Sequence, residues 1–156
     1  MKSVVAFSDL HYNEVPEQLK EACKYADYVF FLGDGIRNLK DVAYADNFHG
    51  VCGNCDYTQF FELEEIIQVE DVKILITHGH RYGVKEDTLS LVSRAHELNC
   101  DVVFYGHTHI ADIETAEGVT LVNPGALYAP MMGNRSYCYA VVNGKKFSAK
   151  IVELKN

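Results

Sequence analysis

The chain has 156 residues, of which 48% are hydrophobic, so it is long enough for one domain with a core of its own. Its formal net charge of −8 argues against a nucleic acid polymer as a partner, because a phosphate backbone is bound by clustered Lys and Arg. No apolar run is long enough to cross a bilayer, and the short apolar start is typical of a core strand rather than a signal peptide. With five cysteines and no signal peptide, we expect reduced thiols and a cytoplasmic protein without a membrane partner.

In the first third of the sequence, strand patterns alternate with helical ones. Apolar and β-branched runs predict three strands, at residues 3–8, 28–32 and 48–52. Asn13 is expected to cap a helix that runs to about Tyr25, with Pro16 near its first turn, and a short helix is expected over residues 36–45. Strands that alternate with helices imply parallel pairing with right-handed crossovers.

The rest of the sequence combines hairpins with one more helix. The pattern predicts a hairpin, a helix and a strand, at residues 60–77, 87–99 and 102–105. Four further strands are expected to form an antiparallel meander, at residues 112–116, 119–123, 137–142 and 146–153. Asn143-Gly144 predicts a type I′ turn between the last two. We therefore expect residues 1–156 to form a single α/β domain, with two sheets packed face to face and helices outside.

A Gly-His-x-His sequence follows the strand at residues 102–105. Gly106 permits a sharp turn, and His107 and His109 come next with one residue between them. In extended backbone, residues i and i+2 point in about the same direction, so the two imidazoles can reach two neighbouring points. That geometry suits two adjacent metal ions, although for an isolated motif a pair of plain loop histidines is the better explanation.

Metal-ligand residue types also follow four other predicted strands. Together the five strand ends carry Asp9 and His11, Asp34, Asn54 with Asp56, His78 with His80, and His107 with His109. Open α/β sheets bind ligands at the carboxyl ends of strands, so five such ends favour a site over coincidence. Mixed imidazole and carboxylate ligands suit Mn²⁺, Fe²⁺, Zn²⁺, Co²⁺ or Ni²⁺. The set is too large for one ion and fits two ions that share a bridging carboxylate.

Each of these residues also has a purely structural explanation. Asp9 and Asp34 precede helical segments and would fit helix N-caps. His78 would fit a hydrogen-bonded core histidine, and Asn54 a turn residue in the left-handed region. Taken one at a time these explanations are reasonable, and only the combination argues for metal.

In this order, the motifs resemble those of the calcineurin-like metallophosphoesterase superfamily. The family pattern stands here as Asp9-Leu10-His11, Gly33-Asp34, Gly53-Asn54, His78-Gly79-His80 and Gly106-His107-Thr108-His109. The short chain and its Gly-Asn-Cys-Asp sequence make it most similar to the small YfcE-like phosphodiesterases. The resemblance implies a four-layer α/β/β/α sandwich with two divalent ions, for which manganese is the first expectation, ahead of nickel, iron, zinc or cobalt.

The resemblance also implies a ligand set for each ion. One ion would be held by Asp9, His11, Asp34 and His109. The other would be held by Asp34, Asn54, His78 and His107, with Asp34 as the bridge. Two such ions about 3.5–4 Å apart activate a shared water and stabilise the charge on the phosphoryl oxygens. The implied activity is hydrolysis of small phosphodiesters by in-line attack of a metal-bridging hydroxide, with Asp34, Asn54 and His107 acting through the metals.

Several positions beside the motifs have open roles. Cys55 stands where many family members have a histidine that assists the leaving group, and a thiol is a poor positive donor, so activated diesters are expected to react best. His80 is expected either near the substrate or as a solvated loop residue, and it stays with Cys55 among the candidate catalytic residues. Asp56 is expected to orient a ligand histidine. Arg37 and Arg81 are candidates for holding phosphate, with a plain surface position as the alternative.

Other classes of protein fit the sequence less well. A subunit of the retromer coat resembles the same small fold and serves as a protein-binding platform, so a non-catalytic metal-binding scaffold is the main alternative. That scaffold departs from the catalytic pattern at a histidine position, whereas every position is filled here. The acidic balance disfavours a nuclease, and a redox pair at Cys52 and Cys55 lacks its usual helix. A homodimer or higher homo-oligomer is left open, with the apolar loop at residues 129–132 as a contact surface.

Overall fold

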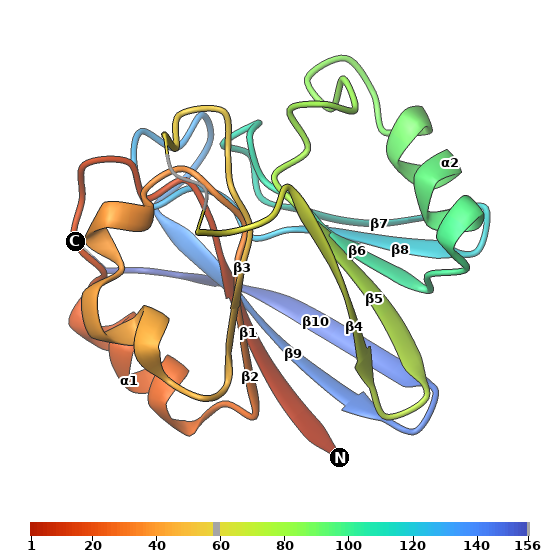
Figure 1. The fold of residues 1–156 in the computed structure, drawn as a ribbon, viewed down its shortest axis with the longest axis horizontal. Helices are drawn as coiled ribbons and strands as arrows, with labels where there is room; N and C mark the ends of the chain where they lie inside the picture. The colour runs from red at the N-terminus through yellow and green to blue at the C-terminus, as the bar shows by residue number, and fades with distance from the viewer. Residues whose placement is uncertain (58–59, 156) are drawn as a thin grey trace.

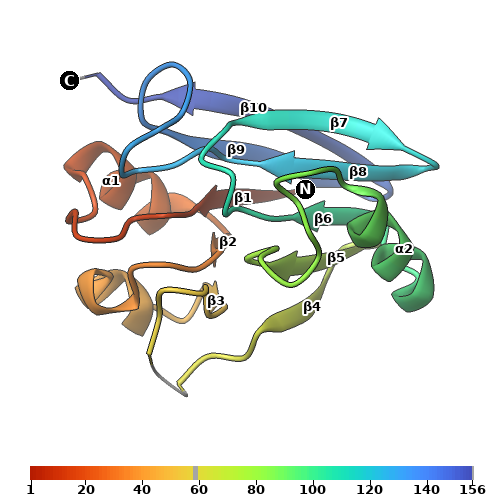
Figure 2. The same cartoon turned by 90° about the horizontal axis from the view of Figure 1, so that it is seen from above.

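The computed structural model describes residues 1–57 and 60–155, which form two five-stranded sheets and two α-helices. Figure 1 shows α1 (Glu17–Tyr25) on one outer side and α2 (Leu89–Leu98) on the other, with both sheets between them. The view from above in Figure 2 shows the same order of layers. The expected four-layer α/β/β/α arrangement is therefore confirmed. Among the described residues, no helix combines the length and the apolar character needed to cross a membrane.

The first sheet has the strand order β10-β9-β1-β2-β3. Its strands are β1 (Lys2–Phe7), β2 (Tyr28–Phe31), β3 (Phe48–Gly50), β9 (Ser136–Asn143) and β10 (Lys146–Glu153). Strands β1, β2 and β3 are parallel, as the alternation of strands and helices predicts. Strand β9 pairs antiparallel with both β1 and β10. The three parallel strands end on the same side, which brings the loops that follow them together.

The second sheet has the strand order β4-β5-β6-β8-β7. Its strands are β4 (Glu64–Val69), β5 (Val72–Thr77), β6 (Val102–Phe104), β7 (Asp112–Ala116) and β8 (Val119–Asn123). The expected single meander at the end of the chain is wrong, because β7–β8 and β9–β10 are two hairpins in different sheets. A hairpin pattern fixes the two strands that it joins and carries no information on which sheet the pair enters.

The short helical segments differ in detail from those expected. Helix α1 has Pro16 as its N-cap, and Asn13 is not a cap, because its Nδ2 donates to the Leu127 carbonyl at 2.7 Å. The helix expected over residues 36–45 is two 3₁₀ turns, η1 (Ile36–Asn38) and η2 (Lys40–Tyr44). Lys40 has φ 48°, and this left-handed residue prevents one continuous α-helix. Helix α2 ends at left-handed Asn99, as expected.

Alternating side chains give each sheet two covered faces. In β1, Val4 packs between the two sheets, whereas Val5 belongs to the cluster beneath α1. Phe30 of the first sheet and Phe104 of the second meet edge to face between the sheets, with ring centroids 5.4 Å apart. Burying a side chain of this kind contributes about 1.5–3 kcal/mol. Strands β1, β2 and β5 are largely buried, and the buried polar residues Ser8, Asp9, Asp34 and His78 follow their ends.

The tight turns follow local backbone chemistry. Glu117 and Gly118, between β7 and β8, both have positive φ, at 50° and 81°, as a type I′ turn requires. The type I′ turn expected at Asn143-Gly144 is wrong. Asn143 pairs with Lys146, so the turn residues are Gly144 and Lys145, and only Gly144 (φ 62°) lies in the left-handed region.

Candidate metal centre

The loops after β1, β2, β5 and β6 meet where these strands end. The Asp9 N–H donates to the Gly33 carbonyl at 3.0 Å in the first sheet, and the Gly106 N–H donates to the His78 carbonyl at 3.0 Å in the second. The His107 N–H donates to Asp9 Oδ2 at 3.0 Å and so joins the two sheets. Strand ends that are far apart in the sequence therefore converge on one place.

Asp9, His11 and His109 form the first group of possible ligands. One side-chain donor atom from each lies within 4.8 Å of the other two. Asp9 Oδ1 is 3.3 Å from His109 Nε2 and 3.7 Å from His11 Nε2, and the two imidazole nitrogens are 3.3 Å apart. A carboxylate and two imidazoles that converge in this way are a donor set for a divalent transition-metal ion.

Asp34, His78 and His107 form the second group, again with donor atoms within 4.8 Å of one another. Asp34 Oδ2 is 3.2 Å from His78 Nε2 and 3.7 Å from His11 Nε2 of the first group. Asp34 is not a helix cap, because the N-cap of η1 is Gly35 and there is no side-chain cap bond. Its carboxylate lies between the two groups, which is the place of a bridging ligand.

Within these two groups, the buried atoms Asp9 Oδ1 and His78 Nε2 lack hydrogen-bond partners among the residues that the structure describes. The other ring nitrogen of His78, Nδ1, is 2.7 Å from the Leu32 carbonyl and must carry the proton to donate to it. Neutral His78 therefore turns the lone pair of Nε2 towards Asp34 Oδ2, and the two repel unless a proton or cation lies between them. Buried polar atoms without partners are costly, and a cation would satisfy both. The residues fit a bound divalent metal.

The electrostatics of the site favour ionised carboxylates. Burial by itself would raise the pKa of Asp9, but the neighbouring imidazoles, led by His109, and the Ser8 hydroxyl together outweigh burial and hold the pKa well below its usual range. Burial by itself would lower the pKa of His78, but the interactions with the Asp34 and Asp9 carboxylates together outweigh burial and raise it. Burial and the neighbouring His78 lower the pKa of His107 to about 4. Deprotonated Asp and neutral His are the forms that coordinate metals.

The backbone of five predicted ligands lies in the left-handed region, which residues other than glycine rarely adopt. The φ angles are 55° at Asp9, 48° at His11, 66° at Asp34, 74° at His107 and 61° at His109. Such conformations cost of order 1–3 kcal/mol each and persist where the surroundings hold them. Strain of this kind clusters at functional sites, and here it aims the side chains at a common centre.

Two motif glycines allow the backbone to approach the carboxylates closely. A Cβ atom at Gly53 would lie 2.1 Å from Asp34 Oδ1, and one at Gly106 would lie 2.1 Å from Ser8 Oγ. The sequence reasoning missed Ser8, a fully buried residue whose hydroxyl donates to Asp9 Oδ2 at 2.7 Å. Ser8 lies one residue before Asp9, at the end of an apolar strand, and this position in the sequence could have indicated a contact with the Asp9 carboxylate.

Asp56 holds the loop that carries Asp34. Its Oδ2 accepts from the N–H groups of Asp34 at 2.7 Å and Gly53 at 2.8 Å. Its Oδ1 accepts from the N–H groups of Gly35 at 2.9 Å and Ile36 at 3.1 Å. The expectation that Asp56 orients a ligand histidine is wrong, because these four backbone amides take both carboxylate oxygens.

We expect Asp56→Asn to lower both stability and metal affinity. An amide NH₂ in place of one oxygen faces two N–H donors and leaves them without an acceptor, which costs about 2–5 kcal/mol of the free energy of unfolding. Misplacement of Asp34 should weaken metal binding about 10–100-fold. Urea unfolding and metal titration measure the two effects. Asp27→Asn, which also removes a carboxylate bound to a backbone amide (Ser3 N–H, 2.8 Å), should leave metal affinity unchanged.

Asn54 and Cys55 form an exposed turn against the site. The Cys55 N–H donates to Asp34 Oδ1 at 2.7 Å, and Cys55 Sγ lies within 4.8 Å of donor atoms of His11 and Asp34. Asn54 Nδ2 is 3.6 Å from Cys55 Sγ. Asn54 is outside the left-handed region, so the explanation of this residue as a left-handed turn position is wrong.

The remaining candidates lie at different distances from the two groups. The ring of His80 is 5.4 Å from that of His78 and 6.2 Å from that of His107, and its buried Nδ1 has no partner among the described residues. Burial and the charge of His78 lower the pKa of His80. This places His80 beside the site. Arg81 is exposed, and Arg37 lines the cleft described below.

The loop with His107 and His109 is braced from behind. The Asn123 Nδ2 donates to the Gly106 carbonyl at 3.3 Å and to Thr108 Oγ1 at 2.9 Å. The Asn123 side chain therefore holds this loop in place. His109 Nδ1 lies 3.0 Å from the Ala129 carbonyl, which fixes the ring.

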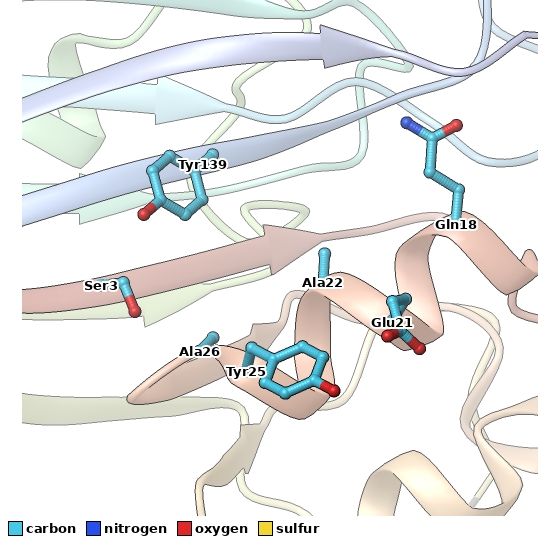
Figure 3. A pocket seen from close by; sticks show the side chains of 7 residues that line it. All are labelled: Ser3, Gln18, Glu21, Ala22, Tyr25, Ala26 and Tyr139. Atoms are coloured by element: carbon cyan, nitrogen blue, oxygen red, sulfur yellow. The ribbon is translucent and has the colours of Figure 1, made fainter.

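A cleft of about 930 Å³ opens beside the first group, with His11, Cys55 and Asp56 in its wall. Its volume lies in the range of small-molecule sites. Another hollow, of about 390 Å³, lies between α1 and the strands β1 and β9, where Tyr25 and Tyr139 line it (Figure 3). None of the predicted ligands lines that second hollow, whereas His11 lines the cleft.

Comparison with known proteins gives one consistent family. A sequence model of the calcineurin-like phosphoesterase superfamily domain matches residues 1–146. A probable metallophosphoesterase of Bacillus subtilis is 33% identical over 153 residues, which cover 96% of this chain and 88% of that protein. A phosphodiesterase of Methanocaldococcus jannaschii is 39% identical over 59 residues, which cover 38% of this chain and 32% of that protein.

Solved structures share the fold. A predicted phosphoesterase from Streptococcus pneumoniae has a TM-score of 0.86 at 22% identity, over 97% of this chain and 89% of that one. Vps29 of Entamoeba histolytica in complex with zinc has a TM-score of 0.79 at 22% identity, over 96% of this chain and 98% of that one. The structures show the fold alone, whereas the sequence model spans nearly the whole chain and all the strand-end motifs. The chain therefore belongs to the calcineurin-like phosphoesterase superfamily.

Proposed function

We propose that the protein is a di-metal-dependent phosphodiesterase that hydrolyses small phosphodiesters. The observation that carries the proposal is the pair of donor groups joined at Asp34, in which the buried Asp9 Oδ1 and His78 Nε2 have no hydrogen-bond partner in the described part of the chain. One ion would be held by Asp9, His11, Asp34 and His109, and the other by Asp34, Asn54, His78 and His107. When bound, such ions supply an activated water and stabilise the charge on the phosphoryl oxygens.

The contribution of the chain itself is to fix these groups before the reaction begins. The Leu32 carbonyl sets the tautomer and ring plane of His78. The Asp56 carboxylate holds the loop of Asp34, and Asn123 holds the loop between the last two histidines. Groups that are already in place need no reorganisation as charge develops in the transition state.

Cys55 limits the range of esters. Burial and the nearby charges of Asp34 and Asp56 raise the pKa of its thiol, so the side chain stays neutral and brings no positive charge to a leaving group. Diesters with good leaving groups should therefore react faster than monoesters. The relative from Methanocaldococcus jannaschii that is named a phosphodiesterase supports the same preference.

Hydrolysis of bis-p-nitrophenyl phosphate by chelated protein tests the proposal. We expect release of p-nitrophenol only after Mn²⁺ or another divalent ion is added, and slower release from p-nitrophenyl phosphate. His107→Ala should remove the activity without unfolding the chain. Since His96 is an exposed histidine on α2, His96→Gln is the matched control and should retain full activity.

The alternative is a protein-interaction scaffold of the same fold, and the structural similarity to Vps29 is the observation that favours it. Metal bound in stoichiometric amount but no cleavage of either ester with any divalent ion would contradict the enzyme and favour the scaffold. Of the possible ions we propose Mn²⁺ first, and the same mixed carboxylate and imidazole ligands also accept Ni²⁺, Fe²⁺, Zn²⁺ or Co²⁺. A cytosolic location is supported by the five cysteines, all of which are free.

A further inference from the structure

The cleft beside the candidate metal centre carries an unusual set of exposed aromatic side chains. Tyr12, Tyr44 and Tyr57 all line it, and they are 85%, 86% and 91% exposed. Large aromatic side chains gain most of their free energy from burial, so several exposed rings at one opening indicate a bound partner. The cleft shares His11 and Cys55 with the site, so whatever fills it is continuous with the reacting group.

Two of these rings are available for stacking. Tyr12 already meets Tyr128 edge to face at 5.9 Å, and Tyr128 in turn packs on His11 at 5.3 Å. Tyr44 and Tyr57 have no ring neighbour among residues 1–57 and 60–155. Their polar tips and flat faces suit a planar group with a polar edge better than an acyl chain, which would need an aliphatic channel.

Arg37 supplies a fixed positive charge in the same cleft. Within the described part of the chain it forms no ion pair, whereas its neighbour Lys40 is 2.7 Å from Glu14. The turn that carries Arg37 is held at both ends. The Ile36 N–H donates to Asp56, and the Asn38 Nδ2 donates to the His11 carbonyl at 2.8 Å. An unpaired guanidinium on a rigid turn beside a phosphoester site is positioned for an anionic oxygen.

We propose that this cleft binds the nucleoside part of the substrate, so that the substrate class is nucleoside 5′-phosphodiesters. The base stacks on Tyr44 and Tyr57, Arg37 pairs with phosphate oxygens, and the scissile phosphorus lies at the metal ligands. The inference rests on the proposed phosphodiesterase function. It adds that the ester group that stays on the phosphate after hydrolysis is a nucleoside.

Two substrates with the same leaving group test the cleft in the metal-loaded protein. They are the p-nitrophenyl ester of thymidine 5′-phosphate and methyl p-nitrophenyl phosphate. We expect kcat/KM to favour the thymidine ester at least about 10-fold, because each base–aromatic contact is worth roughly 5–100-fold. Tyr44→Ala combined with Tyr57→Ala should bring this ratio close to one, mainly through KM. Tyr25→Ala removes a tyrosine of the other hollow that is also exposed, at 73%, and should keep the ratio of the wild type.

Calorimetric binding separates this inference from the proposed activity, because it needs no turnover. Thymidine 5′-monophosphate should bind the metal-loaded protein about 10-fold more weakly after Arg37→Gln. It should also bind more weakly in the double tyrosine variant, and normally in Tyr25→Ala. If neither ester is hydrolysed but nucleotide binding follows this pattern, the proposed activity is contradicted and nucleoside binding in the cleft is supported. The proposal is contradicted if the kcat/KM ratio is near one in the wild type and nucleotide binding is unchanged both by Arg37→Gln and by the double tyrosine substitution.

Discussion

Asp34→Asn is expected to lower phosphodiester hydrolysis by about 10³-fold or more while the fold persists. The amide oxygen can still accept the Cys55 N–H bond, which is 2.7 Å in the wild type, so the loop keeps its support. What is lost is the negative charge next to both donor groups, 3.2 Å from His78 Nε2 and 3.7 Å from His11 Nε2. Electrostatic stabilisation at a reacting centre is commonly worth 10²–10³ for a single group, and a bridge serves two ions.

The measurement is kcat/KM for bis-p-nitrophenyl phosphate, with circular dichroism to check folding and elemental analysis to count bound metal. Asp46→Asn removes an exposed aspartate away from the ligands and should behave as wild type. We expect Asp34→Asn to retain fewer than two ions per chain. Full activity in this variant would contradict a bridging role for Asp34 and with it the two-ion arrangement.

Removing metal is expected to lower the melting temperature of the protein by about 5–10 °C. Ions that bind only the native state stabilise it by about 2.7 kcal/mol at 100 times the dissociation constant, and 1 kcal/mol shifts the melting temperature of a chain of this size by roughly 2–4 °C. The physical source is the repulsion between Asp9 and Asp34, which the bound charge reverses.

Differential scanning calorimetry before and after chelation, followed by return of Mn²⁺, measures this shift. His109→Ala removes a ligand of one ion and should reduce the rise, whereas His96→Gln on α2 should leave it intact. Identical melting temperatures for the chelated and metal-loaded wild type would show that the donor groups do not bind metal in the folded state, whatever their geometry.

Much of the strand framework could be predicted because it rests on local patterns. The bounds of β7, β8 and β10 follow directly from alternating residues and turn glycines. The convergence of the strand ends was also predictable, since parallel strands bring their carboxyl ends to one edge. For both features, the relevant information lies within a few neighbouring residues or in a general rule of topology.

The failures concern partners that are distant in sequence. The side chain of Asn13 reads as a helix cap, yet the Leu127 carbonyl, 114 residues away, takes its hydrogen bond. Asp56 is predicted to orient a ligand histidine, whereas its carboxylate accepts hydrogen bonds from backbone amides of the loops around Asp34. The aromatic cleft was not foreseen either. Tyr44 and Tyr57 belong to no motif, and only the folded loops bring them to one opening.

The hydrogen bond from His107 to Asp9, together with the meeting of His11 and His109, spans 98 residues and ties one sheet to the other. A metal ion held by both sheets would act as a clamp on their separation, so sub-global opening of one sheet away from the other would require release of the ion. Amide hydrogen exchange in β1 and β6 should then slow by more than that in the β9–β10 hairpin when metal is added. The metal centre would thus hold the two sheets of a chain without disulfides together, as a disulfide cross-link does in secreted proteins.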